Sequence, residues 1–115
     1  MAGTADRAVT AAVTLQRGEL RRVDLGGGVT AAVVVQSDAV SAVLPTAVVV
    51  PVVAAAPRAG FPAAVELLVA DRRWWALPTR LTVTTAAALK QPVGPVDAGR
   101  MARLDAALRL VLELP

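Results

Sequence analysis

The chain contains no cysteine and no histidine among its 115 residues. The absence of cysteine excludes a disulfide framework and a thiolate nucleophile, and the two absences together exclude a zinc site of the usual ligand set. A histidine general base, which is common in ribonucleases, is excluded as well. The acidic residues are dispersed along the chain, so we expect neither a metal ion nor any other cofactor.

Aromatic residues are almost absent, with only Phe61, Trp74 and Trp75 present. The hydrophobic fraction of 56% therefore consists mainly of alanine and valine. Small side chains bury little apolar area per residue, so the core of this single domain gains less from burial than its composition suggests. We expect a dimer interface to supply additional burial.

Lysine occurs once, as Lys90, and the other basic residues are arginines; 12 basic and 9 acidic residues give a net charge of +3. An excess of this size permits a polyanionic partner but does not require one. Residues 39–57 carry no charge and approach the length of a membrane span. Three prolines interrupt this stretch and valine dominates it, so it is interpreted as strands of a cytoplasmic protein.

The pattern of residues predicts a small α+β barrel formed by short strands and one C-terminal helix. Strands are expected at residues 18–25, 31–35, 46–53, 63–69 and 77–83, with a short extended piece at 93–96. Turns are expected at residues 26–28 and 71–73, and one helical turn at 85–89. Pro51 indicates an edge or a bulge near the end of its strand. Residues 1–16 are interpreted as a flexible extension before a domain at residues 17–115.

The C-terminal helix is the clearest element, because Met101, Leu104, Leu108 and Val111 repeat at spacings of three and four. Asp97 is expected to cap its first turn. An i, i+4 ion pair is expected between Asp105 and Arg109. Three further leucines near the end widen the apolar surface, so the helix is predicted to pack on more than one side; they are Leu110, Leu112 and Leu114.

Four pieces of the chain, in this order and spacing, resemble the MazF/PemK family of toxin endoribonucleases. They are Arg17-Gly18-Glu19 with Val23-Asp24-Leu25, then Val33 to Ala39 with its Gln-Ser-Asp, then Pro45-Thr46 before Val48 to Pro51, and last Val93-Gly94 with the final helix. The resemblance implies an SH3-like barrel with a C-terminal helix, which dimerises and binds single-stranded RNA in a groove across the dimer. It also implies metal-independent cleavage by the ribose 2′-hydroxyl, and an antitoxin whose tail blocks the same groove.

The resemblance also implies a pair of catalytic positions. The family has a basic residue ahead of its second strand and a Thr or Ser at the start of the third. Thr46 matches the second member of this pair, whereas Thr30 stands at the position of the basic residue. A neutral hydroxyl cannot replace a guanidinium beside a phosphorane, so the missing charge predicts an attenuated enzyme.

Four other residues are candidates for RNA binding. Arg21 and Arg22 are adjacent strand residues that should point to opposite faces, and one of them could supply the missing charge. Arg80 aligns near a basic residue of the family, and Trp74 could stack on a base. Each also has a structural interpretation: the arginines as solvated surface residues, Trp74 as part of the core, and Thr46 as a hydroxyl bonded to local backbone.

The sequence is compatible with three functional hypotheses. The first is an RNA-cleaving toxin, and the second is a non-catalytic relative that binds an antitoxin or nucleic acid. The third is a protein-inhibiting toxin of the same barrel fold, of the type that poisons gyrase. The Pro-Thr pair at residues 45–46 favours the first two over the third.

Overall fold

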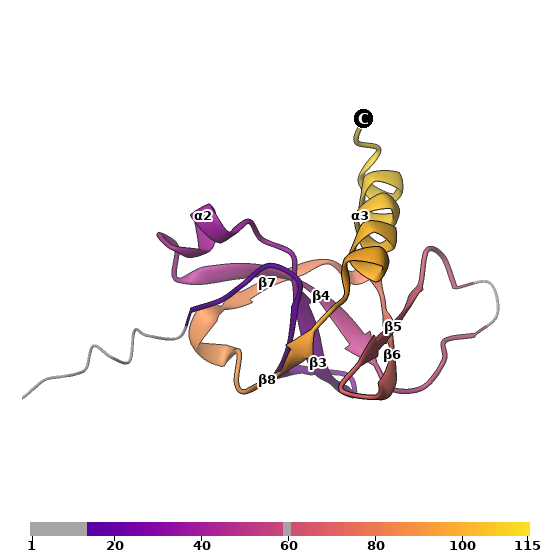
Figure 1. The fold of residues 1–115 in the computed structure, drawn as a ribbon, viewed down its shortest axis with the longest axis horizontal. Coiled ribbons are helices and arrows are strands. Elements are labelled where there is room, and N and C mark those ends of the chain that lie inside the picture. The colour runs from indigo at the N-terminus through magenta and orange to yellow at the C-terminus, as the bar shows by residue number, and fades with distance from the viewer. Residues whose placement is uncertain (1–13, 59–60) are drawn as a thin grey trace, which may run out of the picture.

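The computed structural model describes residues 14–58 and 61–115, which form one curled antiparallel sheet followed by a C-terminal helix (Figure 1). The strands are β2 (Glu19–Gly26), β3 (Val29–Val34), β4 (Thr46–Val53), β5 (Val65–Val69), β6 (Arg72–Ala76), β7 (Thr82–Thr85) and β8 (Pro92–Pro95). The helical elements are α2 (Asp38–Ser41), η1 (Pro78–Arg80), η2 (Ala86–Ala88) and α3 (Ala98–Leu112). The strand order is β5-β6-β4-β3-β2-β8, with β7 also paired to β4. The predicted α+β class, a small SH3-like barrel with a C-terminal helix, is confirmed as a half-barrel.

The hairpin between β2 and β3 turns on two glycines. Gly27 and Gly28 have φ angles of 59° and 83°, in the left-handed region that other residues rarely adopt. A two-residue turn of this kind matches the twist of the strands that it joins. The Oδ1 atom of Asp24 accepts a hydrogen bond from the Gly26 N–H at 3.0 Å and so ends the first strand. The expected turn at residues 26–28 is therefore a hairpin turn.

The sheet packs on both of its faces. One face, here called the helix face, packs against α3 and carries Leu20, Val33, Val50, Val52, Leu67 and Trp74. The opposite face packs against Leu15 and Leu89 and carries Val23, Ala32, Val34, Ala47 and Val49. Because both faces are covered, four consecutive residues of β3, from Ala31 to Val34, are all fully buried, as the continuous apolar run predicts.

Pro51 lies in a central strand, so the expectation of an edge is wrong. On one side, β4 pairs with β3 along residues 49–52. On the other side, β4 pairs with β7 as far as Val49 and with β6 from Val52 onward. Pro51 therefore lies where β4 changes partner, and its missing N–H falls in the gap between two ladders. Its carbonyl accepts a hydrogen bond from Leu77 at 2.9 Å.

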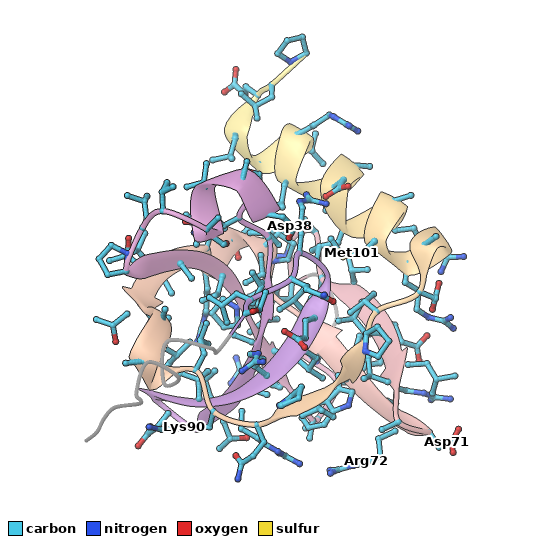
Figure 2. The ribbon with its side chains drawn as sticks, turned by 60° about the vertical axis from the view of Figure 1, so that its left-hand side comes forward. Asp38, Asp71, Arg72, Lys90 and Met101 are labelled. Atoms are coloured by element: carbon cyan, nitrogen blue, oxygen red, sulfur yellow. The ribbon has the colours of Figure 1, made fainter. Side chains whose placement is uncertain are left out.

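The helix α3 begins at the predicted cap and packs along the predicted residues. The Asp97 side chain accepts a hydrogen bond from the Arg100 N–H at 2.9 Å, and this bond, with the Arg100 guanidinium, lowers the pKa of Asp97. Leu104 and Leu108 are buried against the sheet, and Figure 2 shows Met101 between α3 and the strands. The described residues do not cover the predicted second packing side, since Leu110 is 74% exposed.

The segment between residues 70 and 85 differs from the prediction. The turn consists of Ala70 and Asp71, both with positive φ, so the expected turn at residues 71–73 is wrong and β6 begins at Arg72. The expected strand at residues 77–83 is also wrong, because η1 occupies its first half. Pro78 fits the first turn of that helix, which interrupts the alternation, and Val83 is left 60% exposed.

The packed domain begins before Arg17, since Leu15 is only 6% exposed and belongs to the cluster on the opposite face. Most of the predicted N-terminal extension, residues 1–13, lies outside the described residues. In the described ranges, no helix has the length and apolar character needed to span a membrane.

Leu108 is expected to be essential for stability, because it lies in the core between α3 and the sheet. Leu108→Asp would bury an unpaired charge and should lower the free energy of unfolding by about 3 kcal/mol or more. Leu110→Asp, on an exposed position of the same helix, should change it by about 0.5 kcal/mol or less. Urea unfolding followed by circular dichroism measures both. A cooperatively folded Leu108→Asp variant of wild-type stability would contradict the packing of α3.

Candidate functional site

Thr30 is the second residue of β3, one position after the buried Val29, and it is exposed. Ala31 pairs with Val52 on the helix face, so Thr30 lies beside Val53 on the opposite face. Val53 in turn pairs with Trp75, and Trp75 pairs with Glu66. These four side chains, from four neighbouring strands, form one row on the opposite face of the sheet, which we call the Thr30 row.

Thr46 lies far from this row. It is the first residue of β4 and is therefore six positions before Val52, or about 20 Å along the strand. Strand alternation also places it on the helix face, with Val50 and Val52, whereas Thr30 is on the opposite face. Within one chain, Thr30 and Thr46 are therefore far apart and on opposite faces of the sheet, and their catalytic pairing stays a prediction.

The Gln-Ser-Asp motif and Thr46 build a structural junction. Gln36 is 8% exposed, and its side-chain amide donates to the Thr46 carbonyl at 2.9 Å and to the Ser41 hydroxyl at 3.1 Å. Its Oε1 atom accepts from the Val48 N–H at 3.2 Å. Ser37 caps α2, because its hydroxyl accepts from the Val40 N–H at 3.3 Å. The motif therefore joins the end of β3 to the start of β4.

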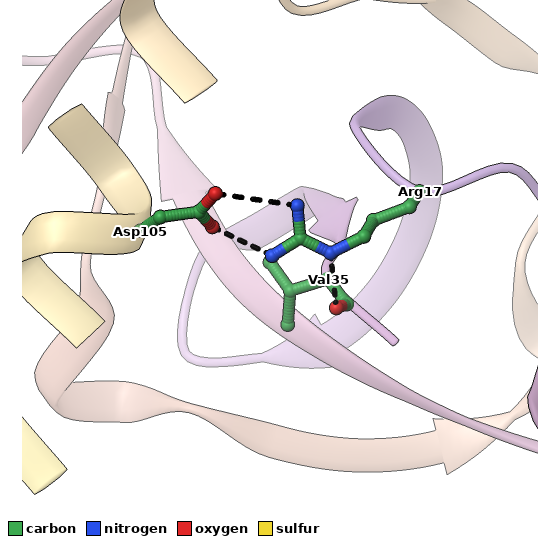
Figure 3. A network of polar contacts seen from close by, with 3 residues as sticks. All are labelled: Arg17, Val35 and Asp105. Carbon is green, nitrogen blue, oxygen red and sulfur yellow. Dashed lines mark hydrogen bonds and ion pairs between the residues drawn. The ribbon is translucent and has the colours of Figure 1, made fainter. Parts of the chain in front are cut away.

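Arg17 joins this junction to α3 (Figure 3). Its guanidinium donates two hydrogen bonds to Asp105, at 2.6 and 3.4 Å, and its Nε atom donates to the Val35 carbonyl at 3.0 Å. The pair is bidentate, the geometry in which arginine binds a carboxylate most strongly. Asp105 is thus paired with Arg17 across the fold, and the expected ion pair with Arg109 is not formed.

The adjacent residues Arg21 and Arg22 point to opposite faces, as predicted. Arg21 is 8% exposed, and its guanidinium is held by Glu19 at 2.8 Å and by the Lys90 carbonyl at 2.8 Å. It is on the same face as Thr30, because it pairs with Ala32, but its charge is already compensated. Arg22 is on the helix face, where its guanidinium lies 5.5 Å from the centre of the Trp74 ring. In the described structure, Arg21 is already paired and Arg22 is on the face opposite Thr30, so a role for either in binding RNA stays a prediction.

Trp74 is 2% exposed and belongs to the core, so a base cannot stack on it. The prediction for Trp74 fails because residues 72–76 form a strand, in which neighbouring residues face opposite sides. The strand turns Trp74 inward and places the half-buried Trp75 in the Thr30 row. Recognising the Ala70–Asp71 turn would have assigned the accessible ring to Trp75.

Arg80 is exposed on η1, and its guanidinium lies 6.0 Å from the centre of the Phe61 ring. Arg73 lies on the same face as Trp75 and forms an ion pair with Glu66 at 2.7 Å. The side chains of Arg73 and Glu66 are 70% and 41% exposed, so this pair is weak. The Thr30 row therefore offers a hydroxyl and an indole ring, but its carboxylate is already paired.

In the part of the chain that the structure describes, no group of three or more His, Cys, Asp or Glu side chains is placed to hold a metal ion. The row can bind a base by stacking and can hydrogen-bond to a ribose or phosphate through Thr30. It has no positive charge of its own facing a reacting phosphate.

Comparison with known proteins identifies the fold. The family model of the PemK-like, MazF-like toxin of type II toxin–antitoxin systems matches residues 16–112. No curated protein matches the sequence. Among solved structures, a mycobacterial endoribonuclease in complex with its cognate antitoxin has 22% identity and a TM-score of 0.77, covering 88% of this chain and 97% of that one.

Two further solved structures agree with this result. The MazE–MazF complex from Deinococcus radiodurans has 19% identity and a TM-score of 0.73, with 89% of this chain and 98% of that one covered. The Mycobacterium tuberculosis toxin MazF-mt6 has 13% identity and a TM-score of 0.71, with 84% and 98% covered. Identities this low show the shared fold alone, but the family model covers most of the sequence. The chain belongs to the PemK-like, MazF-like family of toxins of type II toxin–antitoxin systems.

Proposed function

We propose that this protein is a cytoplasmic toxin that binds single-stranded RNA along the Thr30 row and cleaves it slowly without a metal ion. The observation that carries the proposal is the position of Thr30. It is exposed in the same row as Trp75, with Val53 between them, at the place where the family that the sequence resembles has a basic residue. Attack by a ribose 2′-hydroxyl on the adjacent phosphate requires no cofactor, so positioning and charge stabilisation are what the protein contributes.

The missing cation limits the rate. Negative charge develops on the phosphorane oxygens, and one preorganised contact to such an oxygen is typically worth about 10²–10³ in rate. Thr30 can donate one neutral hydrogen bond, and Val53 beside it can donate none. This lack of charge also favours a second candidate function, in which the protein binds RNA or an antitoxin without cutting.

The proposed partners are an antitoxin and a second copy of the chain. Two of the three solved structures compared above are complexes with antitoxins, which supports an antitoxin for this chain as well. A second copy is supported by an exposed apolar patch at the C-terminal half of α3. It surrounds a cleft of about 340 Å³ that is lined by Leu81, Leu108, Leu112 and Leu114, with Leu112 47% and Leu114 55% exposed.

Thr30→Arg is expected to increase RNA cleavage by about 10²–10³, because a guanidinium would again face the developing charge. The measurement is a time course on a long RNA of mixed sequence in the presence of EDTA. Thr30→Gln serves as the control, since it adds length without charge and should leave the rate near that of wild type.

Thr46→Ala in the Thr30→Arg background distinguishes a site formed within one chain from a site to which a second subunit contributes Thr46. If the site lies along the Thr30 row of one chain, the gained activity should persist. Its loss would show that Thr46 reaches the site from another subunit. Absence of cleavage by every variant would reject the enzyme and leave the binding function.

Trp75→Ala should weaken binding of single-stranded RNA by about 1–3 kcal/mol, the usual contribution of one stacked base. The fold should tolerate this change, because Trp75 is only half-buried. Trp74→Ala should instead destabilise the protein by about 3–5 kcal/mol, since it empties a core position. Fluorescence anisotropy with labelled RNA, together with thermal unfolding, measures both effects. Equal RNA affinity of wild type and Trp75→Ala would remove the Thr30 row as the binding surface.

Leu112→Glu should weaken self-association by about 10-fold or more. In a symmetric dimer both copies would bury the same surface, so the substitution would bury one charge from each copy. Leu110→Glu is the matched control, since Leu110 points away from the cleft and is 74% exposed. Sedimentation equilibrium measures the dissociation constants. A wild-type monomer at high micromolar concentration would reject the dimer.

A further inference from the structure

Two guanidinium groups lie against one buried indole ring at the β5–β6 side of the barrel. The guanidinium carbon of Arg72 is 4.8 Å and that of Arg22 is 5.5 Å from the centre of the Trp74 ring. The two carbons are therefore within about 10 Å of each other, and stacking on the ring holds both in place. Figure 2 shows Arg72 at the tip of the hairpin, beside Asp71 and on the side away from the end of α3.

These two arginines carry charge that no carboxylate compensates in residues 14–58 and 61–115. By contrast, four other arginines form ion pairs with carboxylates in this part of the structure: Arg17 with Asp105, Arg21 with Glu19, Arg73 with Glu66, and Arg100 with Asp97. Asp71 adjoins Arg72 in the chain but forms no ion pair with it in this part of the structure.

The Trp74 ring that both guanidiniums contact also has an unused donor. The Nε1 atom of Trp74 is buried and has no hydrogen-bond partner among the described residues. Buried polar groups in proteins nearly always have a partner, so an unpaired one requires an explanation. At this place the fold thus brings together three donor groups from two strands, none of which has a hydrogen-bond partner among the described residues.

We propose that Arg22 and Arg72 bind phosphate groups of the RNA backbone beside the Thr30 row. The proposal rests on the proposed RNA-binding function. Arginine binds phosphate through paired donors, and stacking on an aromatic ring reduces the entropy that the side chain loses on binding. The span between the two groups suits one phosphate or two consecutive phosphates of a single strand.

The register of the sheet places this phosphate site next to the Thr30 row. Arg22 pairs with Ala31, which adjoins Thr30, and Trp74 adjoins Trp75 in β6. A single-stranded RNA that stacks one base on Trp75 can therefore bring the neighbouring phosphates to Arg22 and Arg72 around the same end of the sheet. These arginines are on the helix face, whereas Thr30 is on the opposite face. They therefore position the RNA and do not contact the phosphate that reacts beside Thr30.

Salt dependence of binding tests the proposal without requiring cleavage. The probe is a 2′-O-methyl RNA of mixed sequence, which the protein cannot cut. The slope of log Kd against log salt concentration should fall by about 0.7 for Arg72→Gln and by about 1.4 for Arg22→Gln/Arg72→Gln. Arg103→Gln is the control, because Arg103 is exposed on α3, and it should leave the slope unchanged. Arg72 is also exposed, so its replacement should not prevent folding.

Tryptophan emission gives a second, local readout. In a Trp75→Phe background only Trp74 emits, so addition of the same RNA should change its emission, and Arg72→Gln should reduce that change. Unchanged slopes in both variants, while wild type still cuts ordinary RNA, would overturn the phosphate site and leave the proposed function intact. Reduced slopes with no cutting by any variant would uphold the site and reject the enzyme. An emission change caused by poly-glutamate but not by RNA would overturn the proposal in favour of an acidic protein segment.

Discussion

The antiparallel register of β3 against β4 decides which side chains can act together. Ala31 lies opposite Val52 and Val34 lies opposite Val49, and every other assignment follows from this ladder. Because neighbouring residues of a strand face opposite sides, the register places Thr30 with Val53 and Trp75 on one face, and Thr46 with Val50 on the other. Polar groups of Gln36 hold the ladder at its far end, where β3 leaves the sheet. A slip by one residue would move every candidate site residue of β3 or β4 to the wrong face.

The sequence predicts well those elements whose signals are local. The glycine turn, β4 from Thr46 to Val53 and the helix after Asp97 follow from turn residues, valine content and apolar period, and the structure has them within one or two residues. The segment from Ala70 to Val83 is different. Its turn uses an alanine and an aspartate at positive φ, which residue type signals weakly, and Pro78 starts a short helix inside an apparently alternating stretch.

The candidate site was predicted less well, for a related reason. A motif places residues in order along the chain, but a site depends on pairing between strands that the motif does not contain. Thr46 follows a proline in a suggestive position, yet the register separates it from Thr30 along the strand and across the sheet. Trp74 and Trp75 are indistinguishable by composition, and only the direction of β6 decides which ring is accessible.

The distribution of arginines separates binding from catalysis in this fold. Arg17 and Arg21 are used for structure, since each is held by a carboxylate and a backbone carbonyl. Arg22 and Arg72 have no carboxylate partner within residues 14–58 and 61–115 and lie near the Thr30 row, while the row itself has no free cation. Phosphate contacts that lie beside a reacting group contribute affinity equally to substrate and transition state, and so do not accelerate the chemical step. Under the proposed function, a chain with this arrangement would bind RNA but cut it slowly, and sequestration of RNA would become its principal effect.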